Sequence, residues 1–186
     1  MEQSGLIRQV ATEVSNSANE VHLAMALRRM SELQMMQARQ SPKDLLGSLS
    51  DAGFAWRDIA ALVGVSVAAV QKWRRGEAIS GERRLSLARI CALLQLAEVT
   101  FLILDPVSWL EMPIMPGVHA TALDLFLGGR DDLVVRLMSE NPPQPESVLD
   151  SYDPQWRVHL VDNEFETFEA GGGMISIRPR NGVRIG

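Results

Sequence analysis

The stretch WRDIAALVGVSVAAVQKWRRG, residues 56–76, decides the fold of this chain. Its pattern is that of two short helices joined by a tight turn. The helices must cross closely, and Ala60 is the small residue that allows it. Gly64 tolerates the positive φ that such a turn requires, and Ser66 can cap the second helix. The apolar residues expected to face inward are Ile59, Leu62, Val63, Val70 and Trp73. The spacing therefore predicts a helix-turn-helix.

The second helix of this motif leaves a polar face to solvent. A helix in the DNA major groove presents its N-terminal side chains to base edges, where Gln71 can pair with adenine and Lys72 can reach guanine. Arg74 and Arg75 are better placed for phosphates. The predicted DNA-binding residues are Arg57, Ser66, Val67, Ala68, Gln71, Lys72, Arg74 and Arg75. The alternative interpretation is an ordinary helical hairpin.

Charge is distributed unevenly along the chain. The net charge of −5 by itself argues against a nucleic-acid partner. Residues 57–90 nevertheless contain seven basic and three acidic residues, a net of +4. Residues 131–170 contain ten acidic residues and two arginines, a net of −8. Such asymmetry suits a protein with two different partners, although the acidic run can equally be a solvated face.

The whole sequence predicts a mainly α chain with four parts. These are an N-terminal extension with a helix (1–40), a helix-turn-helix DNA-binding domain (41–104), a small helical domain (105–140), and an acidic linker with a short β-containing tail (141–186). Helices are expected at 17–40, 42–52, 56–63, 67–75, 82–99, 120–127 and 131–139, and strands at 158–161 and 174–178 around a glycine turn at 171–173. The long helix over 82–99 is apolar on more than one face, so it can also bury one side against a second subunit in a homodimer.

Nothing in the sequence indicates an enzyme, a metal site or a cofactor. Three scattered histidines are present: His22, His119 and His159. None of them sits with Cys, Asp or Glu at metal-ligand spacing. There is no nucleophile elbow, and the glycines at 171–173 are not a phosphate-binding loop. The carboxylates between the expected strands are interpreted as an exposed strand or loop: Glu164, Glu166 and Glu169. No catalytic residue is predicted.

The chain is expected to be cytoplasmic and not to enter a membrane. Its start has neither the basic residues nor the apolar core of a secretion signal. The apolar stretch 85–104 is interrupted by Arg89 and Glu98 and falls short of the ~18 uninterrupted apolar residues of a membrane span. Cys91 is the only cysteine, so no internal disulfide can form, and it is interpreted as a small core residue.

Residues 64–76 resemble the recognition-helix signature of the Xre family of bacterial and phage regulators, G-V-S-x-x-x-[IV]-x-x-W-x-x-G, at every fixed position. Upstream, Ala55, Trp56 and Arg57 stand where that family has a Ser/Thr cap followed by Gln. The Gln often grips a phosphate, and Arg57 is the residue expected to replace it.

A longer resemblance, over about residues 45–140, is to the Xre/MbcA/ParS antitoxins, in which a W-L-x-x-P motif and a P-x-x-L-L helix follow the helix-turn-helix. The matching segments are ERRL (82–85), WLEMP (109–113), ALDLF (122–126) and VVRLM (134–138). The chain departs from that family at Ala120-Thr121, where a proline is usual.

This resemblance implies the antitoxin of a type II toxin-antitoxin system. Such antitoxins bind and neutralise a RES-type toxin that degrades NAD, and they repress their own operon through the helix-turn-helix. The residues expected to bind the partner are Trp109, Leu110, Pro113 and Trp156. The two tryptophans are also candidates for core packing, since a large aromatic serves in both roles.

Two other hypotheses stay open. The first is a stand-alone Xre-family repressor, in which the C-terminal region dimerises or senses a ligand. The second is a structural adaptor whose helix-turn-helix no longer binds DNA. The chain continues about 45 residues beyond the end of the resemblance. That tail is interpreted as a toxin plug, an added dimer element or a ligand-sensing cap.

Overall fold

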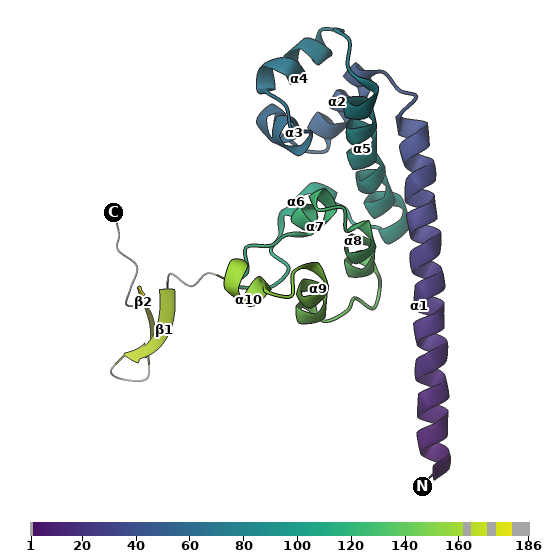
Figure 1. Cartoon of the computed structure of the whole chain (residues 1–186), viewed down its shortest axis with the longest axis vertical. Coiled ribbons are helices and arrows are strands. Elements are labelled where there is room, and N and C mark those ends of the chain that lie inside the picture. The colour runs from purple at the N-terminus through teal and green to yellow at the C-terminus, as the bar shows by residue number, and fades with distance from the viewer. Residues whose placement is uncertain (1, 162–164, 171–173, 180–186) are drawn as a thin grey trace.

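The computed structural model describes residues 2–161, 165–170 and 174–179. Within these residues the chain forms ten helices and one antiparallel hairpin (Figure 1), so the predicted mainly α fold is confirmed. In chain order the elements are α1 (Glu2–Gln37), α2 (Pro42–Asp51), α3 (Trp56–Leu62), α4 (Val67–Arg74), α5 (Gly81–Phe101), α6 (Pro106–Glu111), α7 (Ala122–Leu127), α8 (Asp131–Met138), α9 (Pro145–Tyr152), α10 (Trp156–His159), β1 (Phe165–Ala170) and β2 (Met174–Pro179).

Helix α1 runs along one side of the molecule, and its N-terminal half extends away from the other helices (Figure 1). The sequence predicts this helix only from residue 17, whereas it begins at Glu2. Residues 2–16 contain no proline, so nothing in them interrupts the helix. Further along, Gln37 donates to the side-chain oxygen of Gln95 at 2.9 Å where α1 packs against α5. Helix α1 also contacts α8.

Serine side chains cap the helices that precede and follow the two motif helices. Ser41 caps α2 ahead of Pro42 at the first helical position, and Ser80 caps α5 by accepting from the Arg83 amide. Helix α2 buries three leucines: Leu45, Leu46 and Leu49. It packs against α3, α4 and α5, which places the two motif helices on a continuous apolar support.

One hydrophobic core passes through both predicted helical domains. Helix α5 buries nine residues, among them Leu93 and Leu96, in the same core cluster as Leu110 of α6, Phe126 of α7 and Val134 of α8. Helices α5 and α6 are in contact, and the core continues across the domain boundary predicted at residue 104.

A smaller core holds the segment after residue 140. Trp156 packs with Val118, Ala120 and Leu149 in a second cluster. Helix α9 begins at Pro145 inside the predicted linker, with the proline at a first-turn position that needs no N–H donor. Helix α6, which the sequence analysis does not predict, begins the same way at Pro106 after the cap Asp105.

The strand predicted at 158–161 is wrong. Residues 156–159 form α10, and the Leu160 amide donates to the Trp156 carbonyl at 2.8 Å. Trp156 is the first residue of this helix and is buried, so packing supports the helical turn in place of a strand. Only Val161 forms a bridge, with Val118.

The strand predicted at 174–178 is confirmed as β2, which pairs with β1 from Phe165↔Pro179 to Ala170↔Met174. Glu166 and Glu169 therefore lie on a strand, which is one of the two predicted alternatives, a strand or a loop. Glu164 and the glycine turn at 171–173 lie outside the described residues.

Candidate nucleic-acid interface

Helices α3 and α4 bury the residues that the sequence predicts to face inward. Ile59, Ala60, Val63, Val70 and Trp73 all belong to the main core. Leu62 is half-buried and packs against that core. The first motif helix has no side-chain cap at Ala55; its amide instead donates to the Asp58 carboxylate at 3.2 Å. Asp58 thereby stabilises the start of α3 in place of the missing Ser/Thr cap.

The turn at 63–66 has the conformation that the sequence predicts. Gly64 has φ 65°, in the left-handed region, and the Val65 amide donates to the Ala60 carbonyl at 2.9 Å. Ser66 accepts from the Ala69 amide at 3.2 Å and so caps α4. One contact at this turn has no signal in the sequence: Arg83 of α5 donates to the Val63 carbonyl, which fixes the turn to the body of the protein.

Helix α4 exposes every one of its predicted DNA-binding side chains. They are Val67, Ala68, Gln71, Lys72 and Arg74, followed by Arg75 at the C-cap. Val67, which follows the cap residue Ser66, is 40% exposed, so its side chain is accessible for an apolar contact. Ser66 is also exposed, but its hydroxyl is already engaged in the cap.

Neighbouring groups restrain three of the cations. The Arg74 guanidinium lies 4.1 Å from the centre of the Trp56 ring, an arrangement that holds the side chain while leaving its charge at the surface. Arg75 is 3.5 Å from Glu77. Arg57 is 84% exposed and 3.3 Å from Asp58, so it stands at the start of α3 where a phosphate contact was predicted.

A surface depression of about 510 Å³ lies between α2 and α4. Its lining residues are Lys43, Gly47, Ser50, Asp51, Trp56, Gln71, Arg74 and Arg75. Three cationic side chains thus face one carboxylate, a balance that favours an anionic ligand such as a phosphate backbone. Lys43 is the member that sequence reasoning missed, because nothing local marks a single lysine on a different helix.

The residues predicted to bind a protein partner are differently placed. Leu110 and Trp156 are buried, the first in the main core and the second in the smaller one. Trp109 is half-buried against the main core. Pro113 is exposed and forms a backbone bridge with Thr121. Pro113 and part of Trp109 are therefore accessible to a partner. Leu110 and Trp156 are core residues.

Trp156 also anchors a polar contact. Its indole Nε1 donates to the Asp150 carboxylate at 2.8 Å, and Arg157 pairs with the same carboxylate at 2.7 Å. The hydrogen bond from Arg157 and, to a smaller extent, that from Trp156 lower the pKa of Asp150.

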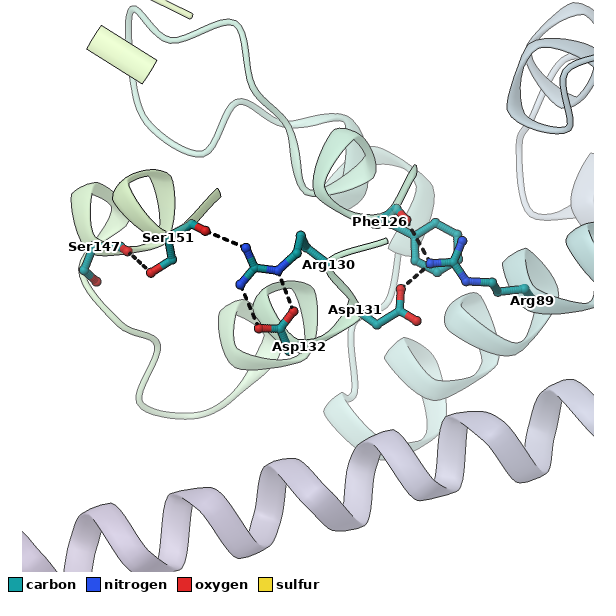
Figure 2. Close-up of polar contacts among 7 residues, drawn as sticks. All are labelled: Arg89, Phe126, Arg130, Asp131, Asp132, Ser147 and Ser151. Atoms are coloured by element: carbon teal, nitrogen blue, oxygen red, sulfur yellow. Dashed lines mark hydrogen bonds and ion pairs between the residues drawn. The ribbon is translucent and has the colours of Figure 1, made fainter. Parts of the chain in front are cut away.

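Arginines tie α5 to the helices that follow it (Figure 2). Arg89 forms an ion pair with Asp131, donates to the Phe126 carbonyl at 2.9 Å, and lies over the Phe126 ring. At the start of α8, Arg130 donates to both carboxylate oxygens of Asp132, each at 3.0 Å, and to the Ser151 carbonyl at 2.5 Å (Figure 2). These contacts tie α5 to α7 and α8, and the start of α8 to α9.

No protein-family model, curated protein or solved structure matches the chain. Among the described residues, no helix is long and apolar enough to cross a membrane.

Proposed function

We propose that the protein is a sequence-specific, double-stranded-DNA-binding regulator. The observation that carries this proposal is the surface of α4: a capped helix, supported by core residues on one side, that exposes Gln71, Lys72, Arg74 and Arg75 on the other. Helices presented in this way fit the major groove with their N-terminal side chains toward the bases.

Each exposed residue has a separate role in this proposal. Gln71 and Lys72 read base edges, with Val67 and Ala68 against thymine methyl groups. Arg57, Arg74 and Arg75 bind phosphates and set the register. Lys43 adds a phosphate contact from α2, since it lines the same depression as the two arginines of α4.

The biological form of this regulator, in our proposal, is a cytoplasmic type II antitoxin. The support is the resemblance of residues 64–76 and 82–138 to the Xre/MbcA/ParS antitoxins. The protein would then repress its own operon as a homodimer on a two-fold-related operator and neutralise a RES-type toxin by direct binding. The exposed surface at Pro113 and Trp109 is the part of the predicted contact set that a toxin can reach.

DNA binding is tested with a duplex that covers the region upstream of the reading frame. Lys72→Ala/Arg75→Ala should weaken binding at least about tenfold, because a good base contact alone is worth ~1–3 kcal/mol. The matched control is Arg39→Ala/Arg157→Ala, which removes the same charge from exposed positions elsewhere. Equal losses in the two variants would mean a nonspecific charge effect. Unchanged binding by both would leave the protein as an adaptor.

The antitoxin role is tested by purification of the tagged protein from its native cells. Recovery of a stoichiometric partner that degrades NAD would support it, and Pro113→Arg should reduce that recovery without affecting DNA binding. If DNA binding holds but only self-association is found, the protein is a stand-alone repressor.

A further inference from the structure

Helix α1 carries an exposed apolar stripe in addition to its buried one. Val21, Met25, Met35 and Met36 are between 56% and 64% exposed. At about 100° per residue they fall within an arc of about 100°. That arc lies about a third of a turn from the buried residues Ala26, Met30 and Leu33. Large apolar side chains gathered on one helix face indicate an interaction surface.

Helix α5 does not offer an equivalent surface. The sequence predicts that one of its faces pairs two subunits, but nine residues of α5 are buried, and α1 and α2 of the same chain pack against it. Its exposed large apolar residues, Leu85 and Val99, lie near opposite ends of the helix and form no stripe. Helix α1, which packs against α5, presents exposed apolar side chains instead.

The apolar and charged residues of the stripe are arranged symmetrically along the helix. Arg28 and Glu32 stand between its two apolar ends, exposed and 3.3 Å apart. Each is two residues from position 30, and Met25 and Met35 are each five residues from it. A two-fold axis perpendicular to the helix at this level places Arg28 of one copy opposite Glu32 of the other. It places Met25 of one copy opposite Met35 of the other. Self-complementarity of this kind is what a two-fold interface requires.

We propose that two copies of the chain pair through this α1 stripe, antiparallel, with Arg28 of each opposite Glu32 of the other. Met25 then packs against Met35 of the second copy. A parallel pair would place like charges opposite one another, which is unfavourable in a close contact. The pairing deepens the proposed function by assigning the surface of the dimer; its test contains no DNA, so its failure is separate from a failure of DNA binding.

The orientation is tested with cysteine variants and a short bis-maleimide linker. Cys91 is buried and does not compete. Met25→Cys and Met35→Cys proteins, each alone, should remain uncrosslinked, and their mixture should give a covalent dimer. Crosslinking of Met25→Cys to itself would overturn the antiparallel arrangement, and absence of crosslinks in every sample would overturn the pairing.

The contacts are tested by sedimentation equilibrium. Glu32→Arg should raise the dissociation constant of the dimer at least about tenfold, and the exchange Arg28→Glu/Glu32→Arg should restore it. Leu104→Gln, which changes a 98% exposed side chain outside the stripe, is the matched control and should dimerise normally. Circular dichroism confirms that each variant keeps its helices. A monomeric wild-type protein, or a dimer indifferent to Glu32→Arg, would contradict the proposal.

Discussion

Replacement of Arg89 by methionine should loosen the attachment of α5 to α7 and α8. Arg89 forms an ion pair with Asp131, donates to the Phe126 carbonyl at 2.9 Å, and stacks over the Phe126 ring with its guanidinium carbon 3.9 Å from the ring centre (Figure 2). The side chains of Arg89 and Asp131 are 28% and 30% exposed, so water screens the pair only in part. Methionine keeps the apolar stem and removes the charge and the donors.

The expected loss follows from these contacts. A hydrogen bond that involves a charged group contributes about 1.5–3 kcal/mol, and a cation over an aromatic ring about 0.5–1 kcal/mol at a partly exposed site. The contributions overlap, and partial exposure favours the lower values, so the free energy of unfolding should fall by about 2 kcal/mol. For a chain of this size that corresponds to a drop in Tm of about 4–8 °C.

Urea unfolding of wild type, Arg89→Met, Asp131→Asn and the double variant forms the assay. The double-mutant cycle should give a coupling of about 1 kcal/mol between the two residues. Arg84→Met, on the exposed part of the same helix, is the control and should unfold like wild type. If Arg89→Met costs no more than Arg84→Met, the ion pair and ring contact do not hold the two regions together, and the reasoning is refuted.

Three further outcomes are expected. Burial raises the pKa of the Cys91 thiol to about 12, so at pH 8 a thiol reagent should label the folded protein only as fast as it opens; rapid labelling without urea would contradict this. The hydrogen bonds from Arg130 lower the pKa of Asp132, so this stabilisation is present above its unfolded pKa of about 3.9 and is lost as pH falls through the lower folded value. Urea midpoints measured down that pH range should fall less steeply for Asp132→Asn than for wild type. Leu102 ends α5 with φ 56° and is 77% exposed, so Leu102→Asn should stabilise the fold by about 0.5–1 kcal/mol; a lower Tm would show that its packing matters more than its backbone.

The local parts of the candidate site could be predicted from the sequence. The positive φ of Gly64 and the cap formed by Ser66 depend only on residues within one turn of the chain, so fixed spacing is sufficient. The contributions of Lys43 and Arg83 could not be predicted, because they depend on how α2 and α5 return beside the motif. Long-range placement is decided by packing, which a single sequence does not show.

The same distinction holds for the fold. Helices α5 and α8 are close to their predicted bounds: α5 follows the cap Ser80, and α8 has a clear apolar face. The strand predicted at 158–161 is wrong because a run of four mostly apolar residues is too short to separate a strand from a helix, and burial of Trp156 in a separate core favours a helical turn. Leu110, in a motif expected to meet a partner, is buried because α6 closes over the end of the main core, and sequence alone does not separate a core leucine from an interface leucine.

The single core that α5 shares with α1, α2 and α6–α8 has a consequence for regulation. Unfolding of the helix-turn-helix and unfolding of α6–α8 are therefore expected to be one cooperative event, so a molecule that binds α6–α8 in their present arrangement also makes α4 harder to unfold. In the proposed function, binding of a toxin then lengthens the life of the DNA-binding form against proteolysis. Release of the toxin shortens it, and the lifetime of the chain in the cell becomes the signal.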